Sequence, residues 1–337
     1  MSDLPLDRLS AWCETRVPGF RGPTTATKFK GGQSNPTYQL DAASGTYVLR
    51  RKPFGQLLPG AHAVDREYLV LSALYGHGVP VARPLALCTD ESVIGAMFYV
   101  MAHVDGRILW DPSLPDIAFD QRRAYYDEIM RVLAALHGVD VGAVGLGNFG
   151  KASHYFLRQI ATWTKQYRAS ESQRIDAMET LIDRLPARCP HDDGRVALVH
   201  GDFRIDNLIW HHDQPRIIAV VDWELATIGH PHADLGYFCM ALRLPRNPAL
   251  PGLAGLDRSA LGIPDETALI EHYQALTRRS AIGDWPFVLA FSFFRLAAIA
   301  QGVAKRALQG NASNERAAEA GAMTTLLAQM GANVLSR

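Results

Sequence analysis

The 337-residue sequence predicts an α+β fold of two lobes: a small β-rich lobe over residues 1–103 and a larger, mostly helical lobe over residues 104–337. Three observations support this prediction. Short β-branched and aromatic runs separated by turn residues fill most of residues 28–101. Longer segments with helical apolar periodicity dominate after residue 122. The hydrophobic content of 48% is ample for two cores.

The first lobe is expected to combine strands with one large helix. Leu6–Thr15 predicts a short leading helix. Tyr38–Leu40 and Thr46–Arg50 predict two strands that are joined by a turn at Ala43–Gly45. Val64–Leu74 then predicts an amphipathic helix.

The second lobe is expected to be built mainly from helices around a few short strands. Short apolar runs predict strands at Val196–His200, Leu208–Trp210 and Arg216–Val221. Helices are predicted at residues 122–137, 154–169, 175–188 and 233–244, with three more within residues 264–335. The longest apolar run, Pro286–Ala304, carries Arg295 near its centre, which favours a buried core helix over a membrane span.

The most specific motif of the chain is His200-Gly-Asp202-Phe-Arg-Ile-Asp-Asn207, with Asp222 fifteen residues after Asn207. One carboxylate can accept a proton from an attacking hydroxyl, while an amide and a second carboxylate can hold magnesium on a nucleotide's phosphates. Phosphoryl transfer to a hydroxyl requires this division of labour. Asn207 and Asp222 flank the predicted hairpin, so we expect them to lie side by side.

A second group of residues upstream suggests a nucleotide-holding device. Gly31 and Gly32 precede the first predicted strand and could bring backbone N–H groups close to phosphates. Arg50 ends the second strand as a cation, and Glu67 on the following helix is placed to pair with it. Arg51 follows directly, but side chains alternate along a strand, so we expect Arg51 to point away from Arg50.

Taken together, these motifs resemble the aminoglycoside phosphotransferase family within the protein-kinase-like superfamily. The likeness extends over about residues 27–300, and its most specific part is HGDFRIDNLIW…IIAVVDWELATIGHPHADLGY. The chain is most similar to the branch that includes the kinase-like domains attached to acyl-CoA dehydrogenase family members ten and eleven. The resemblance implies a protein-kinase-like fold and the use of ATP and Mg²⁺.

The resemblance also implies roles for the matching residues. Asp202 resembles the catalytic base, and Asn207 and Asp222 resemble the magnesium ligands. Arg50 stands where many kinases have lysine, and Glu67 resembles its helical partner.

Nucleotide binding is expected at a flap and at a hinge. Residues 98–106 resemble the hinge between the two lobes in this family. There the backbone of Ala102 and Val104 would bond adenine beside Met101. The flap is not GxGxxG, and no activation loop ending in Ala-Pro-Glu is visible, which argues against a protein kinase. The flap residues expected to contact the nucleotide are Gly31, Gly32, Gln33, Ser34 and Asn35.

Several neighbouring residues are expected to support the site. His200 and Asp234 would brace the catalytic loop, the latter from a following helix. Arg204 could contact the transferred phosphate or pair with a carboxylate, and Asp206 is more consistent with a structural role. Glu224 could reach a second magnesium ion or form a structural pair.

Composition narrows the classes of partner and compartment. With 34 basic and 34 acidic residues, the sequence predicts no nucleic-acid footprint. The polar N-terminus is not a signal peptide, and no membrane span is expected. The four scattered cysteines predict free thiols in a reducing cytoplasm. We therefore expect a cytoplasmic enzyme with a small-molecule substrate.

The acceptor is less well defined than the chemistry. Residues 150–190 and 245–337, the expected substrate side, hold sixteen Lys or Arg against eleven Asp or Glu. This balance disfavours a polycationic aminoglycoside and favours a neutral or anionic acceptor. The resemblance to the acyl-CoA-dehydrogenase-linked branch suggests a hydroxyacyl-CoA.

Other functions remain open at this point. A choline or ethanolamine kinase would need an aromatic and acidic cage, for which Trp110, Trp163 and Trp285 are candidates. A hydrolase with two metals would use histidines between His191 and His232. A non-catalytic nucleotide-binding regulator usually lacks the catalytic base or a metal ligand, whereas this chain keeps Asp202, Asn207 and Asp222.

Overall fold

The computed structural model describes residues 4–29, 35–55, 62–246, 251–278, 282–308 and 323–336. The chain divides into two compact units. The first unit contains residues 1–107, 208–212 and 217–226, and the second contains residues 108–207, 213–216 and 227–337. A β-rich unit and a helical unit confirm the predicted α+β class. The lobe boundary at residues 103/104 stays a prediction.

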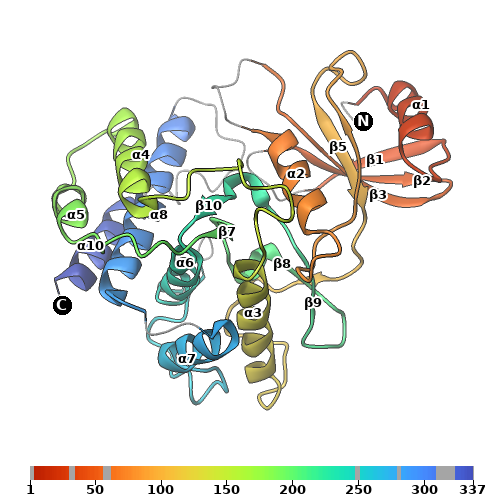
Figure 1. Cartoon of the computed structure of the whole chain (residues 1–337). Helices are drawn as coiled ribbons and strands as arrows, with labels where there is room; N and C mark the ends of the chain where they lie inside the picture. The colour runs from red at the N-terminus through yellow and green to blue at the C-terminus, as the bar shows by residue number, and fades with distance from the viewer. Residues whose placement is uncertain are drawn as a thin grey trace. The chain divides into compact units, whose positions relative to one another are not determined.

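The first unit is organised around a five-stranded antiparallel sheet with the order β1-β2-β3-β5-β4 (Figure 1). Its strands are β1 (Thr24–Lys28), β2 (Thr37–Ala42), β3 (Gly45–Arg51), β4 (Pro84–Cys88) and β5 (Phe98–Ala102). Helices α1 (Leu6–Arg16) and α2 (Val64–Leu74) accompany the sheet. The boundaries of α2 are those that the sequence predicts.

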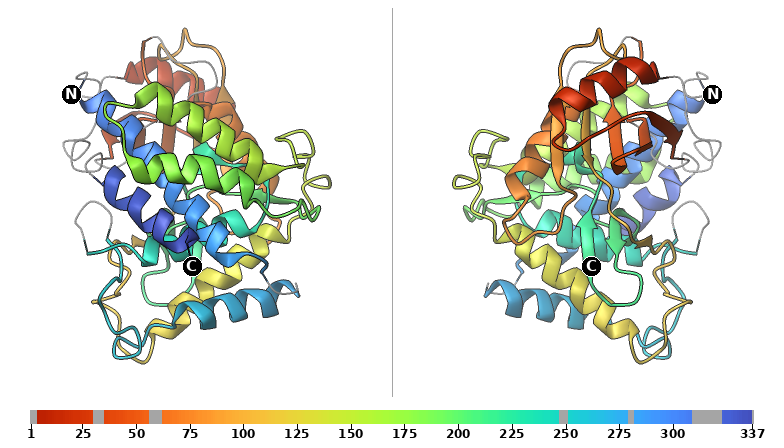
Figure 2. Two further views of the ribbon diagram at one scale, coloured as in Figure 1. Left: turned by 90° about the vertical axis from the view of Figure 1, so that its left-hand side faces the viewer. Right: turned by 90° about the vertical axis from the view of Figure 1, so that its right-hand side faces the viewer.

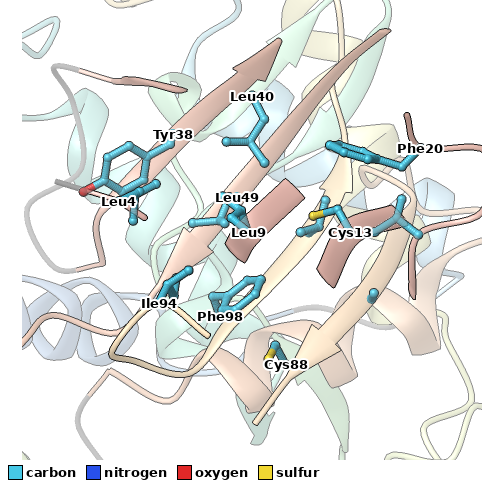
Figure 3. Packing of buried hydrophobic residues seen from close by; sticks show 13 residues of the cluster. Leu4, Leu9, Cys13, Phe20, Tyr38, Leu40, Leu49, Cys88, Ile94 and Phe98 are labelled. Carbon is cyan, nitrogen blue, oxygen red and sulfur yellow. The ribbon is translucent and has the colours of Figure 1, made fainter. Parts of the chain in front are cut away.

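Helix α1 packs on the sheet through a cluster of fully buried apolar side chains (Figure 3). Leu9 and Cys13 of the helix meet Leu40, Leu49 and Phe98 of the strands. Burial also raises the pKa of the Cys13 thiol to about 12, so the thiol remains protonated at neutral pH. Because side chains alternate along β3, a cluster containing Leu49 leaves Arg50 to the other face of the sheet.

A small three-stranded sheet has the order β6-β8-β9, and its strands are β6 (Arg107–Ile108), β8 (Leu208–Trp210) and β9 (Ile217–Val220). The β8–β9 hairpin is antiparallel, as predicted, with Leu208 paired to Val220. The Val220 N–H donates to the Pro80 carbonyl oxygen at 2.8 Å and so anchors the hairpin within the first unit. The 3₁₀ turn η2 (Trp223–Leu225) follows and contacts α2.

The second unit is a helical assembly around one short two-stranded sheet (Figure 2). Strand β7 (Ala197–Val199) pairs with β10 (Thr227–Gly229) in antiparallel orientation. Helices α4 and α5, green in Figure 2, contact α8 in blue, and α8 contacts α6 and α10. The helices are α3 (Arg122–His137), α4 (Tyr155–Ser170), α5 (Asp176–Ala187), α6 (His232–Leu242), α7 (Glu266–Thr277), α8 (Trp285–Leu308) and α10 (Thr324–Leu335).

Helix α8 forms the centre of this unit. By length and composition the segment Trp285–Arg306 could cross a membrane, but 78% of its most apolar window is buried within the protein. Helix α6 lies close to α8 because Gly236 has no side chain: a Cβ atom there would come within 2.3 Å of Val288. The close packing holds α6, which carries Asp234, in a fixed position.

Candidate active site

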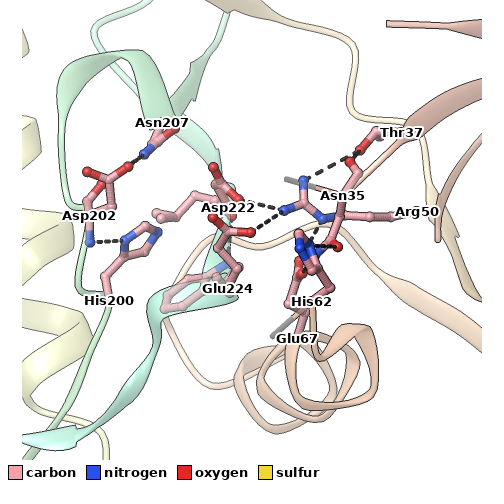
Figure 4. Close-up of polar contacts among 12 residues, drawn as sticks. Asn35, Thr37, Arg50, His62, Glu67, His200, Asp202, Asn207, Asp222 and Glu224 are labelled. Atoms are coloured by element: carbon pink, nitrogen blue, oxygen red, sulfur yellow. Dashed lines mark hydrogen bonds and ion pairs between the residues drawn. The ribbon is translucent and has the colours of Figure 1, made fainter. Parts of the chain in front are cut away.

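The first unit holds a cluster of one cation and three carboxylates on the face of the sheet opposite α1, in which Arg50 and Glu67 are buried and Asp222 and Glu224 are partly exposed. Arg50 Nε lies 2.8 Å from Glu67 Oε2, and Arg50 Nη2 lies 2.6 Å from Asp222 Oδ1 and 3.8 Å from Glu224 Oε2. Figure 4 shows the Arg50 guanidinium directed at these groups. The sequence-predicted pair of Arg50 and Glu67 is therefore present. Arg51 instead stacks on Phe54, with 3.7 Å from Cζ to the ring centroid, as alternation along the strand predicts.

The electrostatics of this cluster keep the arginine charged. Burial alone would lower the pKa of Arg50, but the carboxylates of Glu67 and Asp222 outweigh it and raise that pKa. Burial also raises the pKa of Glu67, against the opposing effect of Arg50. Tyr99 faces Arg50 in the register of the sheet, and its hydroxyl donates to Glu67 at 3.3 Å. The cation is thus fixed at a defined position by groups from β3, β5, α2 and η2.

Asn35 has a role that its sequence context does not reveal. Its side chain is fully buried, and its amide nitrogen donates to Glu67 Oε1 at 2.7 Å. Its amide oxygen lies 3.0 Å from His62 Nδ1. The side chain therefore holds the Glu67 carboxylate, and nucleotide contact by Asn35 stays a prediction. The other predicted flap residues, Gly31, Gly32, Gln33 and Ser34, lie outside the described residues.

The predicted hinge begins at the end of β5. Met101 pairs with Val48 and is partly buried. The Ala102 N–H donates to the Arg83 carbonyl oxygen at 2.9 Å, so this N–H is not available to adenine in this arrangement. The prediction concerned the backbone of Ala102 as a whole, so adenine contact by Ala102 stays a prediction. Val104 is partly buried, and its contact with adenine also stays a prediction.

Asp222 has a left-handed backbone with φ 67° and ψ 60° at the start of η2. This conformation costs a non-glycine residue roughly 1–2 kcal/mol, although Asp tolerates it better than most. Asn207 directly precedes β8 and Asp222 follows the last residue of β9 by two positions. A strained carboxylate at the end of a buried strand is typical of a functional position.

The second unit builds the catalytic loop on strand β7. Gly201 follows His200 with φ 86°, a left-handed conformation that favours glycine. Asp234 of α6 accepts from the His200 N–H at 2.7 Å and from the Gly201 N–H at 2.8 Å. The fully buried His200 ring also accepts at Nδ1 from the Asp202 N–H at 3.1 Å. Both His200 and Asp234 thus brace the loop, as the sequence predicts.

The Asp202 carboxylate is surrounded by donors from its own loop (Figure 4). Asn207 Nδ2 donates to Asp202 Oδ2 at 3.0 Å and to the Asp202 backbone oxygen at 2.8 Å. Arg204 Nε lies 3.6 Å from Asp202 Oδ1, and Arg204 Nη2 bonds Asp206 Oδ2 at 2.6 Å. Arg204 therefore bridges two carboxylates, and Asp206 is a partner of Arg204. The Asp202 carboxylate is thus contacted by two side chains that follow it on the same loop, Arg204 and Asn207.

A polar network behind Asp234 was not predicted from the sequence. His137 at the end of α3 lies 3.3 Å from Asp234 Oδ2 through Nε2 and 2.7 Å from the Tyr273 hydroxyl through Nδ1. Burial alone would raise the pKa of Asp234. The hydrogen bond from His137, the charge of His137 and the hydrogen bond from the Gly201 N–H together lower it. The network links α3, α6 and α7 to the catalytic loop. Only the three-dimensional packing brings residues so distant in sequence together.

The chemistry of the donor atoms fits magnesium. Carboxylate and amide oxygens are the ligands that Mg²⁺ takes, usually one or two from protein with the rest from water and substrate phosphates. In Asn207 the amide nitrogen donates to Asp202, so the amide oxygen is the atom of this side chain that could bind a metal ion. Asp222 offers a carboxylate that is about one-third exposed. Across the described ranges, no group of three or more His, Cys, Asp or Glu is arranged to hold a metal ion.

Comparisons with known proteins show the family of the chain. The model of the phosphotransferase enzyme family matches residues 25–269. Mouse acyl-CoA dehydrogenase family member 10 is 47% identical over 310 residues, which is 92% of this chain and 29% of that protein. Human family member 11 is 42% identical over 312 residues, covering 91% of this chain and 40% of that protein. The chain thus spans well under half the length of these relatives.

Solved structures confirm the protein-kinase-like fold. A protein of Ralstonia eutropha JMP134 assigned as an aminoglycoside phosphotransferase is 48% identical, with a TM-score of 0.89 and coverage of 99% of this chain and 98% of that one. Choline kinase from Cryptosporidium parvum is 11% identical, with a TM-score of 0.64 and coverage of 98% and 96%, so it shares the fold alone. From its matching family model and these relatives, the chain belongs to the phosphotransferase enzyme family.

Proposed function

We propose that the protein is an ATP-dependent small-molecule kinase that transfers the γ-phosphoryl group to an acceptor hydroxyl. The observation that carries the proposal is the Asp202 carboxylate, which Asn207 holds and which stands on a loop braced by Asp234. Such a carboxylate can orient an acceptor hydroxyl and accept its proton late in the reaction. A non-catalytic regulator would not need a carboxylate positioned in this way.

The groups of the first unit supply the nucleotide side of the proposal. Arg50 would neutralise charge that develops on the phosphates, while Glu67 and Asn35 fix its position. Asn207 and Asp222 would hold Mg²⁺, which would neutralise negative charge on the nucleotide's phosphates. In support of ATP, a thermostable mutant of the aminoglycoside phosphotransferase APH(4)-Ia, 13% identical to this chain with a TM-score of 0.61, is known in a ternary complex with AMP-PNP and hygromycin B.

For the acceptor side, the proposal draws on a small cavity in the second unit next to the catalytic loop. Its wall includes the polar pair of Arg204 and Asp206. The remaining wall is apolar, and its Trp110 is exposed to solvent. It consists of Trp110, Pro112, Ile205, Phe238, Ala241, Leu242, Leu244 and Pro251. An acceptor with an apolar portion beside its hydroxyl fits this lining.

The same lining weighs against a polycationic acceptor. Asp206 is the carboxylate of the wall, and Arg204 already pairs with it at 2.6 Å. An aminoglycoside would bring several positive charges to a surface with one neutralised acid. The charges that line the cavity are a more direct argument against a polycationic acceptor than the count of basic and acidic residues over residues 150–190 and 245–337. Many of the counted basic residues are paired elsewhere, such as Arg168 with Glu179 and Arg188 with Asp284.

The aromatic residues considered for a choline cage do not converge on the cavity. Trp163 is buried and contacts Arg295, and Trp285 donates to Glu266 at 2.8 Å. Trp110 is the member of the three that lines the cavity. A neutral or anionic acceptor, with a hydroxyacyl-CoA as its first candidate, is therefore the favoured hypothesis. The names of the longer relatives associate this branch with acyl-CoA chemistry, and no more than that.

The test is a phosphorylation assay with purified protein, MgATP and an acceptor panel. The panel contains a hydroxyacyl-CoA, the same acyl-CoA without the hydroxyl, choline and kanamycin, and the product is identified by mass spectrometry. We expect phosphate on the hydroxyacyl-CoA and none on its deoxy control. GTP in place of ATP measures the nucleotide preference.

Two results would count against the proposal at different levels. If kanamycin or choline is phosphorylated and the hydroxyacyl-CoA is not, the acceptor hypothesis is refuted and the kinase assignment is kept. Absence of transfer to every acceptor, together with absence of ATP hydrolysis, would refute the kinase assignment and favour a nucleotide-binding regulator.

A further inference from the structure

His62 and Asn35 extend the Arg50 cluster of the first unit by two further side chains. Asn35 Nδ2 donates to Glu67 Oε1 at 2.7 Å, and Asn35 Oδ1 lies 3.0 Å from His62 Nδ1. The Glu67 carboxylate, paired with Arg50, only accepts hydrogen bonds, so the amide nitrogen of Asn35 faces it. The amide oxygen then faces His62, which therefore donates through Nδ1–H. Figure 4 shows His62, Asn35 and Glu67 beside the Arg50 guanidinium.

The two oxygens of Glu67 are assigned to different neighbours. Oε1 accepts from Asn35, while Oε2 meets Arg50 Nε at 2.8 Å and accepts from the Tyr99 hydroxyl at 3.3 Å. Glu67 is 2% exposed and Asn35 is 0% exposed, so water has little access to their contact. The Asn35 amide therefore fixes the rotation of the carboxylate that presents Oε2 to Arg50.

His62 holds its place through an unusual backbone conformation. Its φ of 58° lies in the left-handed region, which non-glycine residues seldom adopt. Its carbonyl oxygen accepts from the N–H of Val64, the first residue of α2, at 2.9 Å. The chain thus turns at His62 into the helix that carries Glu67, with the imidazole against Asn35. A strained residue that makes a specific hydrogen bond is typical of a functional position.

We propose that His62 is a positioning residue for the phosphate-binding cation: it orients Asn35, which sets the Glu67 carboxylate, which holds Arg50. The inference rests on the proposed function, in which Arg50 neutralises charge on the nucleotide's phosphates. The three contacts of this relay are 3.0, 2.7 and 2.8 Å long, and all four side chains belong to the first unit. A guanidinium released from the relay keeps its charge but loses the geometry in which it meets the phosphates.

The first experiment separates the hydrogen bond of His62 from its backbone strain. His62→Gly removes the imidazole and relieves the left-handed conformation. His62→Asn keeps an N–H donor at about the position of Nδ1, and asparagine tolerates the left-handed region. The matched control is His154→Gly, because His154 also has a left-handed backbone, with φ 51°, but belongs to the second unit.

Equilibrium binding is measured with two probes, MgAMP-PNP and adenosine, the second of which has no phosphates. We expect His62→Gly to raise the dissociation constant for MgAMP-PNP about 5- to 10-fold and to leave that for adenosine within about twofold. His62→Asn and His154→Gly should bind both probes like the parent protein. Parent affinity for MgAMP-PNP in His62→Gly, or its loss in His62→Asn, would overturn the proposal. A parallel loss for adenosine would also overturn it, because it would show a general disturbance of the lobe.

A double-mutant cycle tests whether His62 acts through Asn35. In the Asn35→Ala background, His62→Gly should change the affinity for MgAMP-PNP by less than about twofold, since its target is gone. A further loss as large as that of His62→Gly alone would refute the relay.

A measurement without nucleotide follows Arg50 directly. In ¹⁵N-labelled protein, the Arg50 Nε–H signal is assigned as the one missing in Arg50→Lys. His62→Gly should shift this signal, while His62→Asn and His154→Gly should leave it in place. An Arg50 signal that does not respond to His62→Gly would contradict the relay, whatever the binding measurement gives. Failure of the proposed function would appear differently, as a parent protein that does not bind MgAMP-PNP.

Discussion

Replacing Asp234 with asparagine tests how the catalytic loop is held. The Asp234 side chain is fully buried and accepts from the His200 N–H at 2.7 Å and the Gly201 N–H at 2.8 Å. Asparagine has nearly the same shape, but one of its two terminal atoms is an NH₂ group. That group would face an N–H donor, so one of the two backbone bonds must be lost.

The expected cost follows from these contacts. The lost hydrogen bond to a charged acceptor contributes about 1.5–3 kcal/mol, and a buried N–H without a partner costs about 1–3 kcal/mol. His137, 3.3 Å from Asp234, loses its charged partner as well. We expect Asp234→Asn to lower the free energy of unfolding by about 3–5 kcal/mol, as for breaking a buried polar network. Because Asp202 follows Gly201 directly, kcat should fall at least about 100-fold.

Urea denaturation gives the stability change, and steady-state kinetics gives kcat. Asp192→Asn serves as the control, since Asp192 also accepts from two backbone N–H groups, those of His154 and Gly194, on another loop of the same unit. Asp192 lies on the exposed surface, so we expect a smaller stability loss and a normal kcat. If Asp234→Asn keeps both parent stability within about 1 kcal/mol and parent kcat, the reasoning about the loop is refuted.

Two further predictions concern buried groups of each unit. Glu67→Gln should lower the free energy of unfolding by about 3 kcal/mol, because the buried Arg50 loses the buried carboxylate that lies 2.8 Å from its Nε, whereas Asp176→Asn in the exposed pair with Arg174 should change it by less than about 1 kcal/mol; equal effects in urea denaturation would contradict this. His232, 4% exposed, has its pKa lowered from 6.5 to about 3, first by burial and then by the neighbouring charges. Below pH 6.5 the unfolded chain therefore takes up a proton at this histidine that the native protein does not take up. The free energy of unfolding should decrease as the pH is lowered, by about 2 kcal/mol from pH 6.5 to pH 5. His232→Gln, which keeps an acceptor for Arg195, should remove that part of the pH dependence; an unchanged slope would show that burial of the imidazole is not its source.

Much of the fold follows from periodicity and motif order. The limits of α2, the β8–β9 hairpin and the alternation of Arg50 and Arg51 are all local consequences of side-chain spacing. The bracing of the loop by Asp234 came from the family resemblance. The structure shows the physical basis of this bracing: the Asp234 carboxylate accepts hydrogen bonds from two backbone N–H groups of the loop.

The remaining features depend on contacts between distant segments. His137 reads in the sequence as the end of an amphipathic helix, and its contacts with Asp234 and Tyr273 exist only once α3, α6 and α7 pack together. Asn35 reads as a flap residue, but packing against α2 commits its amide to Glu67. The Ala102 N–H is used by Arg83 at the sheet edge, a pairing that a single strand pattern does not indicate.

The most direct test of the central claim is the kinetics of Asp202→Ala with MgATP and the phosphorylated acceptor as the readout. The Asp202 carboxylate is placed by Asn207 and by the braced loop to accept the proton of the acceptor hydroxyl. The account predicts that kcat falls by about 10²- to 10⁴-fold while the dissociation constant for ATP changes by less than about threefold. Near-normal turnover in Asp202→Ala would contradict the assignment of this residue as the base.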